Sequence, residues 1–201
     1  MLRIMARLER SFFLQDTLTV ARALLGQRLV RVLENGQRLA GIIVETEAYI
    51  GEEDKACHAA HGRTARNAVM YGPPGHAYVY FIYGMHYCLN VVTEPAGFPA
   101  AVLIRALEPC EGIEWMRLHR HGRPDSELTN GPGRLCQALA IGRAFNGYDL
   151  CTGPLLFTEP GHTNVPVACS QRVGISADEL AKERPWRFFV PDNPFVSTLK
   201  C

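Results

Sequence analysis

A carboxylate and an aromatic ring lie two positions apart near the end of an apolar run in the first quarter of the chain. Glu47 and Tyr49 belong to the sequence ETEAY at 45–49. A carboxylate can take a proton from water as a general base, and a tyrosine ring offers a flat face to a purine. His58 and Arg105 add an imidazole and a guanidinium group. Together these residues predict a pocket that accepts an unstacked nucleobase beside an activated water molecule.

The identity of the general base is open at this stage, because ETEAY contains two glutamates. Glu45 and Glu47 are two residues apart, so they face the same side of a regular strand. For Arg105, a scaffold ion pair with a carboxylate is one interpretation. The residue types therefore predict the chemistry without choosing between the two carboxylates.

A second set of candidate residues lies in YVYFIYGMHYCLN at 78–90. Tyr83 stands before Gly84, where a tight turn would project its ring outward, and a core tyrosine is the alternative. Met85 follows the same turn, with core packing as its alternative. Asn90 is a candidate for lining the pocket, for a turn or for a buried hydrogen bond. This segment therefore predicts an exposed aromatic turn near the pocket.

The first half of the chain must supply the strands that hold these side chains. We expect a helix over 16–25, because an aspartate caps its start and a glycine follows its end. The segments 27–33 and 38–50 have the composition of strands. Asn35-Gly36 between them is a strong hairpin signal. The second of these strands should present Glu47 near its end.

The remainder of the chain mixes strands, loops and short helices without internal repeats. The polar stretch 51–74 is typical of a functional loop, and the charged segment 119–129 is typical of a mobile surface loop. NGPG at 130–133 leads into a helical pattern and leaves backbone N–H groups free for a phosphate. We expect strands at 78–93 and 101–107, helices at 111–120 and 134–141, and Pro-punctuated strands and loops in the C-terminal third.

The composition is that of one well-filled domain. The 201 residues are 47% hydrophobic and 20% charged, which is ordinary for a globular protein. We therefore expect a single domain over 1–201 with a mixed α/β (α+β) fold, built on a curved antiparallel sheet flanked by short helices. No apolar run approaches the roughly 20 residues of a membrane helix, and no signal-peptide pattern opens the chain. We expect an intracellular protein with no membrane partner.

Arginine dominates the basic residues, although the net charge is only +1. Only three of the 21 basic residues are lysines. The guanidinium fork of arginine suits contacts with phosphate, whereas a bias in genomic base composition is the simpler explanation. The candidate phosphate contacts are Arg63, Arg66, Arg134 and Arg143.

The seven cysteines are scattered along the chain and never form a CxxC pair. A zinc site would need four converging ligands, and Cys57, His58 and His61 offer too few in one place. We therefore expect no metal site, and buried thiols in a reducing compartment.

Six segments, taken in order, resemble the alkyladenine (3-methyladenine) DNA glycosylase family. They are ETEAYIGEEDKACHAAHGRTARN, YVYFIYGMHYCLNVV, LIRALEP, NGPGRLCQALAI, RVGI and RFFVPDNPFVS. The resemblance spans nearly the whole chain and implies a single-domain mixed α/β fold around a curved antiparallel sheet. It also implies hydrolysis of the N-glycosidic bond of damaged purines in double-stranded DNA, by a monomer that needs no metal or cofactor.

The resemblance implies a role for each candidate in the pocket. Glu47 matches the catalytic glutamate of the family, and Arg105 matches the arginine that helps to position the attacking water. Tyr49 and Tyr80 match the pair of rings that stack on the flipped purine. His58 matches a residue that lines the pocket and hydrogen-bonds to the base.

The resemblance also covers residues expected to contact DNA. Tyr83 matches the side chain that fills the space left by the flipped nucleotide, and Met85 matches a neighbour that contacts DNA. Asn90 matches a residue whose bulk disfavours the exocyclic amino group of guanine. Ala65 departs from the family, which often has proline there, and the loop 63–66 is one residue shorter than in animal relatives. Both differences leave the DNA contacts of this loop open.

The expected reaction removes the base and leaves the DNA strand intact. Strand cleavage needs an amine nucleophile, and only Lys55 lies near these motifs. The expected substrates are 3-methyladenine, 7-methylguanine, hypoxanthine and etheno-adenine, removed in base excision repair. A noncatalytic module that binds damaged DNA would keep Tyr83 but would not need Glu47 beside a stacking ring. A hydrolase of small nucleosides would need the carboxylate and the rings but not Tyr83.

Overall fold

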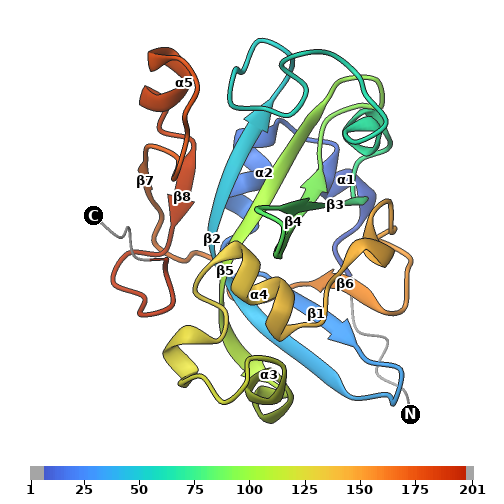
Figure 1. The fold of residues 1–201 in the computed structure, drawn as a ribbon, viewed down its shortest axis with the longest axis vertical. Coiled ribbons are helices and arrows are strands. Elements are labelled where there is room, and N and C mark those ends of the chain that lie inside the picture. Colours follow the sequence, from blue (N-terminus) through green and yellow to red (C-terminus); the bar gives the residue numbers. More distant parts are fainter. Residues whose placement is uncertain (1–6, 198–201) are drawn as a thin grey trace.

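A curled antiparallel sheet forms the centre of the structure, a computed structural model that describes residues 7–197 (Figure 1). Within that range the strands are β1 (Arg28–Val32), β2 (Arg38–Ile50), β3 (Ala77–Ile82), β4 (His86–Val92), β5 (Ala100–Glu111), β6 (Leu156–Glu159), β7 (Ala168–Ser170) and β8 (Arg187–Phe189). The helices there are α1 (Arg10–Phe13), α2 (Thr17–Ala23), α3 (Ile113–His119), α4 (Pro132–Ala138) and α5 (Glu179–Glu183), with short 3-10 turns η1 (Ala68–Tyr71), η2 (Asp125–Glu127) and η3 (Arg143–Phe145).

The strands lie in the order β3-β4-β5-β2-β1-β6, and β8 pairs with both β2 and β7. Each of these pairings is antiparallel. The predicted fold class, a mixed α/β fold with short helices around a curved antiparallel sheet, is confirmed. The predicted limits of the domain at 1 and 201 lie outside the described residues and stay a prediction.

Strand β2 joins the two parts of the sheet. It pairs with β5 along most of its length, with β1 through 38–42 and with β8 through 45–47. Its register with β5 shifts between Ile43 and Thr46, and such bulges bend a strand and re-aim its side chains. The bulge therefore lies where β2 changes its neighbour from β1 to β8, immediately before Glu47.

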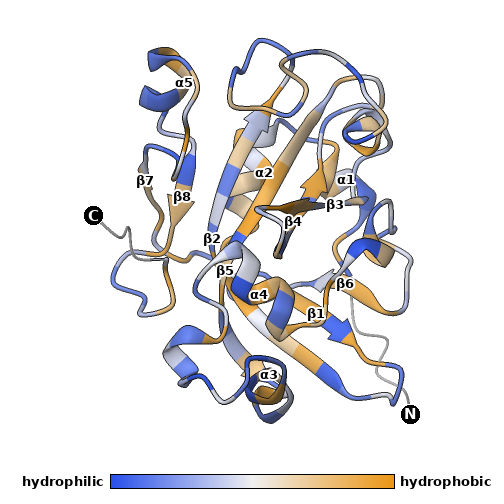
Figure 2. Ribbon diagram, in the orientation of Figure 1, coloured by the Kyte–Doolittle hydropathy of each residue, from blue (hydrophilic) through white to orange (hydrophobic). Residues whose placement is uncertain are grey.

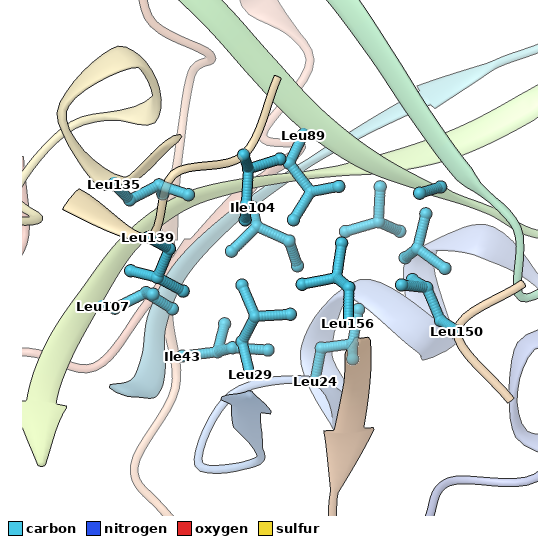
Figure 3. Close-up of a cluster of buried hydrophobic side chains, with 14 of the residues drawn as sticks. Leu24, Leu29, Ile43, Leu89, Ile104, Leu107, Leu135, Leu139, Leu150 and Leu156 are labelled. Atoms are coloured by element: carbon cyan, nitrogen blue, oxygen red, sulfur yellow. The ribbon is translucent and has the colours of Figure 1, made fainter. Parts of the chain in front are cut away.

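The main core lies on the face of β2 that carries Thr46, opposite Glu47. Thr46 Oγ1 donates to the carbonyl oxygen of Ala21 at 2.9 Å, so α2 packs against this face. Burying each large aliphatic side chain contributes about 1.5–3 kcal/mol. Figure 3 shows side chains from α2, α4 and the central strands meeting in this core, among them Leu24, Leu29, Ile43, Leu89, Ile104, Leu107, Leu135, Leu139, Leu150 and Leu156.

The hydropathy of the elements follows these layers. β4 and β5 are largely hydrophobic, whereas α5 and the loops are largely hydrophilic (Figure 2). Hydrophilic segments interrupt β2, and Glu45, Thr46 and Glu47 are all fully buried there. Buried carboxylates require partners, so this part of the strand has a purpose other than core packing.

Two local predictions at the N-terminal side are confirmed. The Asp16 side chain accepts a hydrogen bond from the backbone N–H of Thr19, which caps α2. Gly26 follows the helix with φ +85°, and a Cβ at this position would lie 2.4 Å from the carbonyl oxygen of His162. The Asn35-Gly36 turn connects β1 and β2, with Leu33 N–H bonded to the carbonyl oxygen of Gln37.

Three predicted element boundaries are corrected. The segment 78–93 forms two strands, because the chain reverses at Tyr83 and Gly84, both with positive φ. The strand predicted at 101–107 extends to Glu111, and α3 begins only after Gly112, whose φ of +72° breaks the strand. A tight turn at Gly84 was predicted, but the same segment was also predicted as one strand, and the left-handed conformation of Gly112 was not predicted.

The helix predicted at 134–141 begins earlier and ends earlier. Pro132 occupies its first turn, where the missing N–H costs nothing. The helix ends at Ala138, and Ala140 has φ +51°. The segment 119–129, predicted as a surface loop, contains η2 and is anchored by Thr129, whose hydroxyl donates to the carbonyl oxygen of Leu107 at 2.6 Å.

The prediction that the cysteines are buried is only partly right. Three of the six within the described residues are buried, and all six are free thiols. Cys110 and Cys169 are exposed, since one lies at the solvent end of β5 and the other on the outermost strand, β7. Cys151 is partly exposed, and Cys201 lies outside the described residues. No helix within 7–197 has the length and apolar character needed to cross a membrane.

Candidate active site

One cavity of about 1180 Å³ collects most of the predicted site residues. It is bounded by the β3–β4 hairpin, the loop after β2, the segment 173–177, the start of α4 and the loop before it. The predicted residues that line it are Tyr49, His58, Tyr80, Tyr83, Asn90, Arg105 and Arg134.

Glu47 lies directly behind the cavity wall. Its carboxylate has no exposed surface, and its three hydrogen-bond donors all line the cavity. Tyr49 Oη donates to Oε2 at 2.8 Å, Arg105 Nη1 donates to Oε2 at 3.2 Å, and Val173 N–H donates to Oε1 at 2.7 Å. The pocket and the carboxylate predicted from ETEAY therefore lie next to each other.

Glu45 also faces Arg105, as expected from the strand period, but its environment differs. Its Oε1 accepts from Arg105 Nε, Arg187 Nε and the Ser197 hydroxyl, and its Oε2 accepts from Ser197 N–H. Four donors thus converge on Glu45, three of them on Oε1. A carboxylate offers about four acceptor positions, and Glu47 receives three donors from the described residues, one on Oε1 and two on Oε2.

The environment of Glu47 favours the protonated carboxyl more than water does. Burial raises the pKa of Glu47, while Arg105, the Val173 N–H and the Tyr49 hydroxyl oppose that rise. Burial and the neighbouring carboxylate also keep the pKa of Tyr49 well above its usual range, so its hydroxyl remains a donor. A carboxylate with a raised pKa is a better proton acceptor than an exposed glutamate, provided that it is ionised.

The aromatic residues form one wall of the cavity. The rings of His58 and Tyr80 meet edge to face with 4.4 Å between their centroids. His58 Nδ1 lies 2.7 Å from the hydroxyl of Tyr78, which packs behind them. Burial, aided by the charge of Arg66, lowers the pKa of His58, so a neutral imidazole faces the cavity. Tyr49 lines the same cavity, so the predicted ring pair and the imidazole are brought together.

Asn90 combines two of the interpretations open from its sequence. Its side-chain amide donates to the carbonyl oxygen of Tyr78 at 3.0 Å, and the residue is almost fully buried. It also lines the cavity beside Leu103, its partner across β4 and β5. Asn90 is therefore a rigid side chain at the edge of the aromatic wall.

The tip of the β3–β4 hairpin presents apolar side chains to solvent. Tyr83 is 80% exposed and Met85 is 68% exposed. Tyr83 and Gly84 have φ values of +54° and +67°, the two consecutive positive values that a type I′ turn requires. A bulky residue in this region is uncommon and strained. The predicted turn is thus present, and it holds the Tyr83 ring at the mouth of the cavity.

The four candidate phosphate contacts are spread over the surface. Arg134 lines the cavity, and Arg66 lies over the Tyr80 ring, with its Cζ 5.8 Å from the centroid. Arg63 is exposed and lies over Tyr71. Arg143 is exposed in η3, and neither it nor Arg63 nor Arg66 lines the cavity, so the structure does not bring the four together.

The sequence analysis missed the C-terminal residues that complete the site. Val173 donates to Glu47, and the preceding Arg172 forms a fully buried ion pair with Asp54. The Arg172 guanidinium also lies 4.8 Å from the centroid of the Tyr49 ring. The signal was present, because Asp54 and Arg172 belong to segments that carry the family resemblance.

A buried carboxylate, an aromatic cavity in front of it and an exposed ring at its mouth are what a glycosylase that acts on an extruded base would need. The methylpurine-DNA glycosylase (MPG) family model matches residues 11–194. A relative from Methanocella arvoryzae, named "Putative 3-methyladenine DNA glycosylase", is 54% identical over 94% of this chain and 95% of its own. A relative of the same name from Desulfitobacterium hafniense is 50% identical over 96% of this chain and 99% of its own.

The chain belongs to the methylpurine-DNA glycosylase family. It is accordingly a DNA N-glycosylase, an enzyme of DNA repair whose substrate is damaged DNA. Of the three classes considered from the sequence, the comparisons support the DNA glycosylase.

Proposed function

We propose that this enzyme hydrolyses alkylated and deaminated purines out of double-stranded DNA and leaves an abasic site. The lesions we assign are 3-methyladenine, 7-methylguanine, hypoxanthine and etheno-adenine. The observation that carries the proposal is the free acceptor site on Glu47, located behind a cavity lined by aromatic rings.

Recognition begins with extrusion of the damaged nucleotide from the duplex. A base inside the stack cannot be reached, and side chains that enter the vacated space are a common solution. Tyr83 takes this role, because its ring is exposed at the tip of the hairpin and next to the cavity. Met85 contacts the neighbouring base pair from the same turn. Arg63, Arg66, Arg134 and Arg143 contact phosphates of the DNA backbone. Arg134 does so from the cavity wall, and Arg143 from a position outside the cavity.

The extruded purine then stacks among Tyr49, Tyr80 and His58. Alkylated purines are electron-poor, so electron-rich rings favour them over normal bases. A neutral His58, as the lowered pKa requires, can hydrogen-bond to the base without adding positive charge beside a cationic lesion. Asn90 limits the space at the purine edge and disfavours an exocyclic amino group.

Hydrolysis breaks the bond between C1′ of the sugar and the purine nitrogen. Water bound at the open site of Glu47 attacks C1′ while positive charge builds on the sugar ring. Its proton passes to Glu47 and its oxygen stays on C1′, while the bonding electrons leave with the purine. Arg105 positions the water and holds Glu47 through Oε2, which leaves the carboxylate correctly aimed.

The reaction stops at the abasic site, because water rather than an amine is the nucleophile. Lys55 lines the cavity and is the one lysine within 7–197 that does so. Strand cleavage would require such an amine to form a Schiff base. Borohydride should therefore trap no covalent complex with damaged DNA, and a complex that disappears in Lys55→Gln would show strand-cleaving chemistry.

We also propose that the enzyme works as a monomer in the compartment that contains the genome. The cavity, the exposed ring and the buried carboxylate all belong to a single chain. One chain therefore supplies every group that the mechanism uses. Measurement of its mass in solution, alone and with a lesion-containing duplex, tests this part of the proposal.

The deciding experiment measures release of 3-methyladenine and hypoxanthine from duplex DNA by the wild-type enzyme and by Glu47→Gln. Abasic sites are read as alkali-cleavable breaks. Glu53→Gln is a matched control, since Glu53 is exposed in the loop after β2. The wild type and the control should release base, while Glu47→Gln should bind the lesion and release base at least about 100-fold more slowly. Release by Glu47→Gln at the wild-type rate would show that another group activates the water.

A further inference from the structure

The cavity extends beyond the residues that surround the purine. Its lining also includes Arg120, Arg123 and Glu127, together with the segment 130–134. This part of the chain was expected to be a mobile surface loop. The structure instead folds it against the entrance to the active site, where three guanidinium groups face one space.

The charges of this arginine cluster, comprising Arg120, Arg123 and Arg134, are poorly compensated. The terminal nitrogens of Arg120 donate to two neutral oxygens, Gln137 Oε1 and the backbone carbonyl of Glu127. Arg134 donates to another neutral oxygen, Asn130 Oδ1, at 2.6 Å. Within 7–197 the one carboxylate within 4 Å of the cluster is that of Glu127, 3.9 Å from Arg123. The cluster therefore carries a surplus of positive charge.

The surplus of positive charge is energetically unfavourable at Arg120, because this side chain is partly buried. Burial lowers the pKa of Arg120, and the charges of Arg134 and Arg123 lower it further. Its Nε is also buried without a hydrogen-bond partner among the described residues. Like charges held together beside an open cavity gain most from an anion, and guanidinium groups bind phosphate oxygens in pairs.

The cluster is held in place by contacts that do not use its charges. Arg117 forms a two-bond ion pair with Asp125 on the same loop, at 2.7 Å for each bond. Leu128 and Thr129 are fully buried behind it. A Cβ at Gly133 would lie 2.9 Å from Cγ of His86, so glycine allows the start of α4 to approach the hairpin. The cluster is thus a fixed part of the cavity.

We propose that Arg120, Arg123 and Arg134 form a binding site for a phosphodiester group of the DNA strand that carries the damaged nucleotide. The inference rests on the proposed function and specifies how the substrate is held. The damaged strand is assigned because the cluster and the purine-binding rings share one cavity, and only that strand sends a nucleotide into it. The site holds the backbone next to the lesion while Tyr83 occupies the stack.

The test is a thermodynamic cycle between single arginines and single phosphates. Binding is measured by fluorescence anisotropy on duplexes that carry a reduced abasic site and one neutral methylphosphonate linkage. In the wild type, neutralising one linkage beside the lesion should weaken binding about tenfold. In Arg123→Gln or Arg134→Gln the same linkage should have little further effect. The proposal would be overturned if each methylphosphonate weakened binding as much in the arginine variants as in the wild type. It would also be overturned if the linkage whose effect disappears lay in the complementary strand.

Arg22→Gln is the matched control. It removes the same charge from α2, which covers the opposite face of β2, so its methylphosphonate penalties should equal those of the wild type. If the methylphosphonate linkage also ceased to weaken binding in Arg22→Gln, the effect would come from net charge in general, and the proposed phosphate site would be wrong.

Two further measurements separate this inference from the proposed function and from a structural role. Binding to an abasic analogue needs no catalysis, so the cycle reads the phosphate site even if base release fails. Base release by saturating Arg22→Gln, the control outside the cluster, should proceed at the wild-type rate. The melting temperature of Arg123→Gln should equal or exceed that of the wild type, because like-charge repulsion is relieved. A drop of several degrees would instead assign Arg123 a structural role and overturn the proposal.

Discussion

Arg172 and Asp54 form a two-bond ion pair that is completely closed to solvent, and the residue after Arg172 donates to Glu47. The two bonds measure 2.6 and 2.8 Å, and both side chains have no exposed surface. Arg172 also donates to the carbonyl oxygens of Ala48 and Ala181 at 2.9 and 3.0 Å. The pair therefore ties β2 and the loop after it to the C-terminal segment that carries Val173.

Breaking this pair should be severe. Asp54→Asn leaves the buried Arg172 without a counterion, and removing one partner of such a pair typically costs about 3–5 kcal/mol. The control is Glu179→Gln, which breaks an exposed pair with Lys182 and should cost less than about 1 kcal/mol. Urea unfolding of the two variants gives the comparison. Equal losses in both variants would mean that burial of the Asp54 pair adds nothing to its stability.

Glu47→Gln should lower the rate of base release while keeping or raising the stability of the fold. Base release should fall by about 100-fold to 10,000-fold, the range for loss of a general base. Because burial raises the pKa of Glu47, the folded protein disfavours its ionised form, and the neutral amide removes that cost. At pH 7 the variant should unfold at the same or a higher temperature than the wild type.

The same linkage predicts how this stability difference depends on pH. Below the pKa of an unfolded glutamate, about 4.3, Glu47 is protonated in both states and the difference should vanish. It should grow as the pH rises from that value to the higher pKa of the folded state, and should be constant above it. Thermal unfolding from pH 4 to pH 8 measures it, and a difference that grows toward acid would contradict the raised pKa.

The rate of base release should fall at acid pH, because Glu47 must be ionised to accept a proton. Tyr49→Phe removes the hydroxyl that stabilises the ionised carboxylate while keeping the ring. The acid limb of the single-turnover profile should therefore move to higher pH in this variant. Tyr80→Phe, which makes no bond to Glu47, serves as the control and should keep the wild-type limb. Coincident profiles for all three proteins would argue against Glu47 as the titrating base.

Tyr83→Gly should impair lesion recognition without destabilising the fold. Tyr83 has φ +54°, a conformation that costs an ordinary residue about 1–2 kcal/mol and glycine very little. Relief of this strain should offset the greater freedom of glycine in the unfolded chain, so the unfolding free energy should change by less than about 1 kcal/mol. Base release from duplex DNA by Tyr83→Gly should drop. Tyr83→Ala should lose activity as well, and because alanine remains strained at positive φ, its stability should not benefit in the way that of Tyr83→Gly does. Full activity in Tyr83→Gly would exclude the wedge role.

Much of the architecture follows from local patterns. The Asp16 cap, the Asn35-Gly36 turn and the extent of β2 were all predictable, because each depends on neighbouring residues. The turn at Gly84 was also visible, whereas a tyrosine at positive φ was not. Proline is typical of a helix start, but the predicted helix began after Pro132 rather than at it.

The functional site also has features that were predictable from the sequence and features that were not. The aromatic residues and Glu47 lie in short segments whose strand period and turn chemistry are visible in sequence. The choice of Glu47 over Glu45 depends on donors from Arg187 and Ser197, which are far away in the chain. Of the arginine cluster, Arg134 was predicted as a phosphate contact. Arg120 and Arg123 were missed, because composition marks 119–129 only as charged and the burial of Leu128 and Thr129 determines where this segment faces.

The hydrogen bonds around β2 also set when activity becomes possible during synthesis. The donors from Val173 to Glu47 and from Ser197 to Glu45 lie 126 and 152 residues further along the chain. A ribosome therefore makes Glu47, Tyr49 and His58 long before the groups that hold the carboxylates exist. A chain that ends before Val173 therefore carries the site residues of the first half without the backbone donor to Glu47 and the Ser197 donor to Glu45.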